Sequence, residues 1–324
     1  MRLVAFQDHR GSRLGVEVDE LVVDLDSAFR SAFGSGGPTD LLALIDGGPV
    51  LLAACQQAVD RSVQSPRRDR ARLEADGVLL DLASIRPLAP LRPRAILCSG
   101  SNYWDHRGEK PPVPEDDPEF FLKLPDLVTD PGDPVALDPK VTSKLDHETE
   151  LAIVIGREGR HISAAKARQH VFGYTIMNDV TARDQQIRRN PGGYYEYFLG
   201  PGKNFDTAAP MGPVVVTADE IPDPQGLRLR SFVNGKPRQK ANTADMIWGV
   251  DALVQFFSKF VTLRPGFVIS SGTPGRTAWG WDPEVGGKRT RDRPEPLYLR
   301  PGDVVRVEIE KIGALENPIV AAHQ

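Results

Sequence analysis

The sequence has few cysteines, no long apolar run and no long block of basic residues. Only two cysteines, Cys55 and Cys98, occur among its 324 residues. They lie far apart without metal-ligand spacing, which argues against a disulfide framework and suits a reducing cytosol. No apolar run approaches the length of a membrane span, and residues 1–10 lack the apolar core of a signal peptide. We therefore expect a soluble, cytoplasmic protein.

The charge balance limits the classes of partner. With 40 basic and 44 acidic side chains, the formal net charge is -4. This near-balance argues against nucleic acid or an anionic membrane as the main partner. The overall field would not attract an acidic small-molecule substrate, so such a substrate would need a local metal ion or basic cluster.

The spacing of apolar and turn residues divides the chain into two parts. Residues 1–90 are typical of a small α/β domain, and the proline-punctuated connector 86–94 marks its end. The expected elements are paired strands at 14–18 and 20–25, helices at 39–45 and 50–63, an exposed loop at 65–72 and a strand at 78–82. Residues 91–324 would then form one larger domain, a division that the chain length allows.

The larger part is richer in strands than in βαβ units. Runs rich in Val and Ile and bounded by Gly or Pro predict its strands. These are expected at 95–98, 151–155, 171–178, 214–217, 227–233, 267–270 and 304–309, with helices at 180–189 and 246–260. The fold class predicted is α+β, with a mixed β-rich domain rather than a doubly wound sheet. No dinucleotide fingerprint or P-loop spacing occurs.

Two glutamates stand two residues apart at the start of an apolar run. In a strand, Glu148 and Glu150 would face the same side, and the apolar residues that follow indicate burial. Neighbouring buried carboxylates repel each other unless a cation holds them. The alternative is a solvated strand edge, which is the commoner fate of glutamate.

A third carboxylate, Asp179, closes the strand-like run 171–178. Capping a following helix is the commoner role for an aspartate in this position. If Asp179 instead joined Glu148 and Glu150, the three oxygen ligands would suit a hard cation, Mg²⁺ or Mn²⁺. Spacing alone leaves both readings open.

Several segments resemble successive signatures of the fumarylacetoacetate hydrolase family. They are Gly100-Ser101-Asn102-Tyr103 with His106 and Glu109, then 145–156, 178–184, 271–274, 299–303 and 312–318. The segments follow the family's order over about residues 90–320. The resemblance implies the family's β-rich catalytic domain, a homodimer, and Glu148, Glu150 and Asp179 as the metal ligands.

The resemblance also points to catalytic side chains. His106 and Glu109 are three residues apart, so one helical turn would place them on one face. A carboxylate there would fix the imidazole tautomer and raise its basicity, as a general base requires. A surface histidine beside an unrelated glutamate is the alternative. Lys203 matches a family lysine that faces the substrate, although a lysine is more often simply solvated.

Four more residues are candidates for substrate binding. Arg183 and Gln186 would share one helix face and could hold a carboxylate, although an ordinary amphipathic face needs no function. Thr273, in a tight turn, resembles the family residue that binds the substrate carboxylate. Lys123 also resembles a family lysine, but Leu124 intervenes before the proline that often follows directly in the family.

Two segments depart from the family's compact pattern. The segment 276–298, which includes Trp279 and Trp281, is longer than the compact version of the family. The segment 190–202 contains four aromatic side chains. Either segment would line a larger or more aromatic substrate, or would make surface and dimer contacts.

The function predicted first is metal-dependent hydrolysis of a carbon–carbon bond in an acylpyruvate-like 1,3-diketo acid. The metal would polarise the 2-oxo group, His106 would activate water and Lys203 would stabilise the oxyanion. Alternatives within enzymes are decarboxylation or tautomerisation of a 2-oxo diacid and ureidoglycolate-type lyase chemistry. A catalytically inactive scaffold is the non-enzyme alternative, and the full set of metal and dyad residues argues against it.

Overall fold

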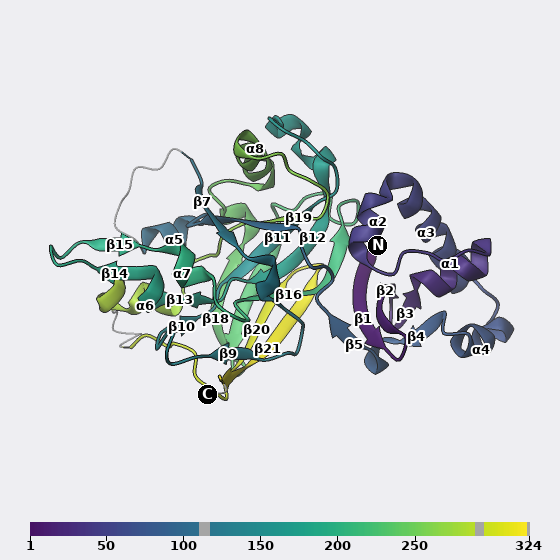
Figure 1. The fold of residues 1–324 in the computed structure, drawn as a ribbon, viewed down its shortest axis with the longest axis horizontal. Coiled ribbons are helices and arrows are strands. Elements are labelled where there is room, and N and C mark those ends of the chain that lie inside the picture. The colour runs from purple at the N-terminus through teal and green to yellow at the C-terminus, as the bar shows by residue number, and fades with distance from the viewer. Residues whose placement is uncertain (110–116, 289–294, 323–324) are drawn as a thin grey trace.

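The computed structural model describes residues 1–109, 117–288 and 295–322. The molecule is elongated, and its N-terminal strands and helices form one end (Figure 1). The fold is α+β and rich in strands, as the sequence predicts. Within the described ranges, no helix is long and apolar enough to cross a membrane.

The N-terminal end is a small antiparallel sheet covered by helices. Its strands are β1 (Arg2–Asp8), β2 (Gly11–Val18), β3 (Leu21–Asp24), β4 (Leu79–Asp81) and β5 (Arg86–Leu88). Its helices are α1 (Leu25–Phe33), α2 (Leu41–Asp46), α3 (Gly48–Val63), α4 (Arg67–Ala75) and the 3₁₀ turn η1 (Leu82–Ser84). The predicted hairpin is confirmed, because β2 and β3 pair antiparallel.

At this end of the molecule one helix was not expected and one local prediction was wrong. Helix α1 was not expected, yet Asp24 caps it by accepting a hydrogen bond from the Ser27 N–H, and aspartate is a preferred N-cap. The exposed loop expected at 65–72 is largely helix α4. Its Arg, Ala, Leu and Glu residues are strong helix formers, so solvent exposure did not require a loop.

One twelve-stranded sheet runs through the whole molecule. Its order is β4-β3-β2-β1-β16-β12-β11-β19-β6-β7, with β5 beside β1 and β8 beside β16. The further strands are β6 (Ala95–Gly100), β7 (Glu119–Lys123), β8 (Val128–Thr129), β11 (Thr149–Ile155), β12 (Val171–Asn178), β16 (Ala209–Thr217) and β19 (Phe267–Ser270). Strand β1 pairs with β16, so the N-terminal sheet continues into the larger part. The division into domains at residue 90 stays a prediction.

A second sheet of five strands has the order β18-β17-β20-β21-β9. Its strands are β9 (Val135–Leu137), β17 (Arg228–Val233), β18 (Lys236–Asn242), β20 (Val304–Ile309) and β21 (Gly313–Ala321).

Strand β11, inside the twelve-stranded sheet, is buried on both faces. Leu151 and Ile153 belong to one hydrophobic cluster, whereas Ala152 and Val154 belong to another. This double burial explains its continuous apolar run.

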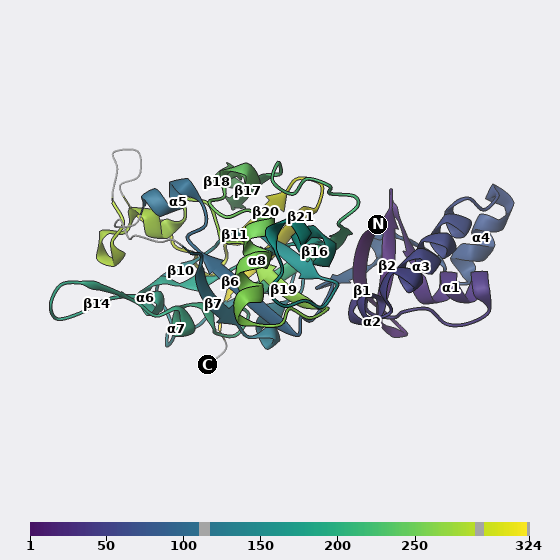
Figure 2. The ribbon, with the colours of Figure 1, turned by 90° about the horizontal axis from the view of Figure 1, so that it is seen from above.

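Short elements gather at the end of the molecule away from the N-terminal helices (Figure 2). They are α5 (Trp104–Gly108), α6 (Arg183–Gln186), α7 (Leu199–Lys203) and two strand pairs, β10 (Leu145–Asp146) with β13 (Thr181–Ala182) and β14 (Ile187–Arg189) with β15 (Tyr195–Tyr197). The remaining helices are α8 (Val250–Phe260) and the 3₁₀ turns η2 (Pro125–Leu127), η3 (Ala164–His170), η4 (Thr243–Asp245), η5 (Ala278–Trp281) and η6 (Pro283–Val285).

Two predicted helices are shorter than expected. Within 180–189 only the four residues of α6 are helical, because β13 and β14 form ladders with β10 and β15 on either side. Within 246–260 the helix begins at Val250. The preceding backbone is held elsewhere, since the Trp248 N–H donates to the Asn102 side chain.

Candidate metal centre and active site

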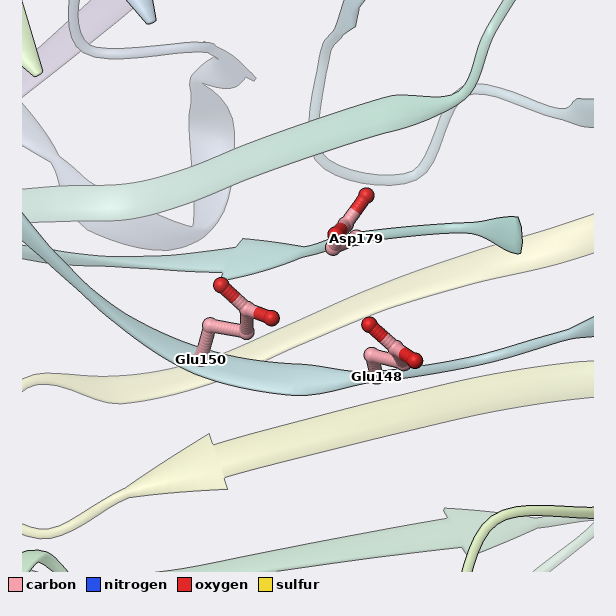
Figure 3. A group of neighbouring side chains, drawn as sticks. All are labelled: Glu148, Glu150 and Asp179. Atoms are coloured by element: carbon pink, nitrogen blue, oxygen red, sulfur yellow. The ribbon is translucent and has the colours of Figure 1, made fainter. Parts of the chain in front are cut away.

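The three predicted metal ligands lie together in the core. The register between β11 and β12 pairs Thr149 with Asn178, and this brings the two glutamates beside the following Asp179. One oxygen from each carboxylate lies within 4.8 Å of the others. Figure 3 shows both glutamate side chains rising from one strand segment toward the segment that carries Asp179.

Both commonplace alternatives for these carboxylates were wrong. Glu148, Glu150 and Asp179 are only 4%, 1% and 0% exposed, so they do not form a solvated edge. Asp179 caps no helix either, because α6 begins four residues later with Ala182 as its N-cap.

The charges of the triad are strongly coupled to their surroundings. Burial, followed by the charges of Asp179 and Glu148, raises the pKa of Glu150 well above its ordinary value. Ser270 and the Gly272 N–H donate hydrogen bonds to its carboxylate. Three buried carboxylates this close are not all ionised without further positive charge. Since the donors are hard oxygens, the set fits a divalent cation of the Mg²⁺ or Mn²⁺ type.

Two buried lysines reach the same carboxylates. The Lys203 ammonium, from α7, lies 2.6 Å from Glu148 and 2.7 Å from Asp179 and donates to the Thr181 hydroxyl at 2.8 Å. Burial opposes its charge, but the carboxylates outweigh burial and raise the pKa of Lys203 above its ordinary value. The Lys123 ammonium lies 2.7 Å from the other oxygen of Asp179 and donates to the Lys203 carbonyl.

Arg183 is fully buried against the protein's own acids. Its Nε donates to Asp146 at 2.9 Å and its Nη1 to Gln186 at 2.8 Å, while its Nη2 lies 2.6 Å from Glu148. Although burial acts in the opposite direction, Lys203 and Arg183 hold the pKa of Glu148 well below its ordinary value. Arg183 therefore supports the triad from behind, and direct contact of Arg183 with substrate stays a prediction.

The structure brings His106 and Glu109 together on one helical turn. The imidazole Nδ1 lies 3.0 Å from Glu109 Oε2, and the other oxygen of Glu109 accepts the Arg276 N–H at 2.9 Å. In a neutral imidazole one ring nitrogen carries the hydrogen and the other keeps a lone pair. A hydrogen on Nδ1 would point at Glu109 and leave the lone pair on Nε2. The His106 side chain is 3% exposed, so the imidazole is buried and Glu109 holds its orientation.

A small cavity joins most of the predicted site residues. Its wall is formed by Ser99, Gly100, Ser101, His106, Glu119, Phe121, Glu148, Glu150, Gln186, Leu199, Lys203, Thr273 and Trp279. Four other predicted residues are not part of this wall but contact residues that form it: Lys123, Arg183, Asp179 and Glu109. Thr273 accepts a hydrogen bond from Gln239 at 2.8 Å, which fixes its place on the wall.

Sequence reasoning missed two residues of this site. Asp146 accepts hydrogen bonds from Arg183 and from the backbone of Ala278 and Trp279. Its spacing from Glu148, two residues earlier in the same alternation, was the available signal. Trp279 lies in 276–298, for which lining the substrate was one of two alternatives, but no sequence signal singled out this residue for the cavity wall.

Comparison with known proteins identifies the family. Residues 95–320 match the family model described as the C-terminal part of fumarylacetoacetate (FAA) hydrolase. The chain belongs to the fumarylacetoacetate hydrolase family. It is 37% identical over 326 residues to a protein named oxaloacetate tautomerase fahd2, mitochondrial, of Xenopus laevis, covering 99% of this chain and 90% of that protein.

Solved structures of the fumarylacetoacetate hydrolase family agree in fold. A fumarylacetoacetate hydrolase from Exiguobacterium antarcticum superimposes with a TM-score of 0.76 and 32% identity, covering 99% of this chain and all of the other. A maleylpyruvate hydrolase from Sphingobium sp. SYK-6, solved with manganese(II) and pyruvate, superimposes with a TM-score of 0.67 and 26% identity, covering both chains fully. The chain is thus a member of an enzyme family with hydrolases and tautomerases, and its acidic triad could hold a divalent metal.

Proposed function

We propose that the protein is a divalent-metal-dependent tautomerase of oxaloacetate or a closely similar 2-oxo dicarboxylate. The observation that carries this proposal is the cavity itself, where Glu148 and Glu150 of the acidic triad, the buried His106 and the Lys203 ammonium meet. The likeness over nearly the whole chain to an oxaloacetate tautomerase supports it. Tautomerisation of a 2-oxo diacid thereby takes precedence over acylpyruvate hydrolysis, which the sequence had favoured.

The residues present fit a bound metal and a proton transfer beside it. Glu148, Glu150 and Asp179 would hold Mg²⁺ or Mn²⁺, which supplies a Lewis acid for the 2-oxo acid end of the substrate. His106 Nε2 removes a proton from C3 of the keto form, and the electron pair of that bond moves toward the C2 oxygen. Lys203, held as an ammonium, stabilises the charge that develops on this oxygen. The proton taken up by His106 then passes to this oxygen, which completes the enol and returns His106 to its neutral form.

The other candidate roles follow from position on the cavity wall. Gln186 and Thr273 are part of the same cavity wall and would orient the substrate carboxylates. Lys123 and Arg183 would act through Asp179 and Glu148 by holding those carboxylates in place. A homodimer and a cytoplasmic location remain predictions.

Hydrolysis of an acylpyruvate is the second candidate. The His106–Glu109 pair favours it, because a buried histidine oriented by a carboxylate also activates water. Hydrolysis cleaves the carbon chain, whereas tautomerisation conserves every carbon, so the products distinguish the two reactions.

The experiment follows the ultraviolet absorbance of the oxaloacetate enol and analyses the products. We expect enol decay to accelerate with Mn²⁺ or Mg²⁺ and to slow with EDTA, with all four substrate carbons retained. Acetylpyruvate is assayed in parallel for release of pyruvate. If the protein cleaves acetylpyruvate rapidly and does not accelerate decay of the oxaloacetate enol, hydrolysis becomes the first candidate function.

A further inference from the structure

The two segments that depart from the compact family pattern form one small unit beside the active site. Ile187 of β14, Trp279 of η5 and Val285 of η6 make a hydrophobic cluster separate from the two main clusters, and Tyr195 of β15 packs on it. The Tyr195 hydroxyl also donates to the Pro283 carbonyl at 3.0 Å. Residues 187–197 and 278–285 therefore support each other at the end of the molecule that carries α5 and α6 (Figure 1).

Hydrogen bonds hold both the side chain and the backbone of Trp279. The indole N–H donates to the Val285 carbonyl at 2.7 Å, and the backbone N–H donates to Asp146 at 3.2 Å. The side chain is 1% exposed. A large ring fixed by one hydrogen bond of its own and by an apolar cluster, on a backbone that is also hydrogen-bonded, is a rigid surface rather than an adaptable one.

The fixed ring contacts two groups of the active site. Its centroid lies 5.1 Å from that of His106 in an edge-to-face contact, and the Arg183 guanidinium lies 5.4 Å from its centroid on the ring face. Both contacts favour this orientation. Trp279 is also part of the cavity wall, and its ring contacts His106, so a group that enters the cavity beside His106 comes close to the indole.

We propose that Trp279 is the specificity-determining residue that limits the size of the substrate at the end remote from the 2-oxo acid. This inference rests on the proposed function, in which the triad receives the 2-oxo acid end and His106 acts at C3. The substituent beyond C3 then lies against the indole. A carboxylate is accommodated there, whereas an extended alkyl or acyl chain collides with a ring that has no room to move.

The test measures inhibition of oxaloacetate tautomerisation by 2-oxobutyrate, 2-oxohexanoate and 2-oxooctanoate. In the wild type we expect inhibition constants to rise with chain length. Trp279→Ala should lower the constant for 2-oxooctanoate at least tenfold relative to that for 2-oxobutyrate, since each methylene accommodated in an apolar pocket is worth about 10–200-fold. Trp279→Phe has a smaller ring, so its ratio of inhibition constants should lie between those of the wild type and Trp279→Ala. This variant provides the test if Trp279→Ala does not fold.

Trp281→Ala is the matched control. Trp281 is a buried tryptophan of the same 3₁₀ turn but is not part of the cavity wall, so its loss should leave the ratio of the inhibition constants unchanged. If Trp279 instead positioned His106, its replacement would lower kcat for oxaloacetate tautomerisation but would leave the ratio of the inhibition constants unchanged. An unchanged ratio in Trp279→Ala and Trp279→Phe overturns the inference. A wild-type protein that neither turns over oxaloacetate nor is measurably affected by it overturns the proposed function instead.

Discussion

Replacing Arg183 by methionine should destabilise the protein strongly, because Arg183 neutralises two buried acids. The guanidinium contacts Asp146 at 2.9 Å, Glu148 at 2.6 Å and Gln186 at 2.8 Å. Methionine fills a similar space with a flexible apolar chain, so the change removes the charge and hydrogen bonds rather than most of the volume.

The structure sets the size of the effect. Removing one partner of a buried ion pair costs about 3–5 kcal/mol, because the other charge is left uncompensated. Asp146 keeps the backbone N–H donors of His147, Ala278 and Trp279, and Glu148 keeps Lys203. We therefore expect a loss at the lower end, about 3 kcal/mol in the free energy of unfolding.

The assay is urea unfolding followed by tryptophan fluorescence and far-ultraviolet circular dichroism. Arg230→Met is the matched control, because Arg230 pairs with Glu308 at 2.8 Å while its side chain is 56% exposed. Exposed pairs contribute about 0–1 kcal/mol. If Arg183→Met costs no more than Arg230→Met, the network around Asp146 does not stabilise the fold as argued.

Two further predictions concern the base and the thiols. His106→Ala should slow tautomerisation about 10²–10⁴-fold, and Glu109→Gln should slow it less. Stopped-flow decay of the enol measures both rates. A wild-type rate in His106→Ala would exclude His106 as the base. Burial raises the pKa of Cys55 to about 11, and burial together with the nearby carboxylates raises that of Cys98 well above its ordinary value. Both thiols should therefore stay protonated and resist iodoacetamide at pH 8 until urea unfolds the chain. Mass spectrometry that finds Cys98 alkylated in the native protein would contradict its place in the core.

Local sequence patterns were sufficient where packing agrees with propensity. The apolar run after Glu150 predicted a strand buried on both faces, and β11 confirms it. The pattern failed at 180–189, where pairing with β10 and β15 leaves only one helical turn. Strand pairing overrides helix propensity there. The partner β10 is distant in sequence, so no local window contains it, whereas β14 and β15 form a local hairpin that the helical pattern concealed.

Local sequence patterns predicted only part of the candidate site. Alternation placed Glu148 and Glu150 on one face, but their distance from Asp179 depends on the register between β11 and β12, which no local pattern specifies. The family resemblance supplied that link. Trp279 reaches the cavity through contacts with Asp146 and Val285, so its position arises only in the folded chain.

The central claim is that one divalent cation binds at the buried acidic triad. Glu150→Gln tests it well, because the glutamine oxygen can still accept the hydrogen bonds from Ser270 and the Gly272 N–H, so the fold should be retained. Glu158→Gln is the control, since the Glu158 side chain is 66% exposed and pairs only loosely with Arg264, at 3.9 Å.

The measurement is Mn²⁺ titration followed by electron paramagnetic resonance, which reports free Mn²⁺ independently of turnover. We expect one Mn²⁺ per chain in the wild type and in Glu158→Gln. Even residues that only support metal ligands change affinity by about 10–100-fold, so Glu150→Gln should weaken binding by more than about 100-fold. Equal Mn²⁺ affinity in the wild type and Glu150→Gln would contradict the assignment of the triad as the metal site.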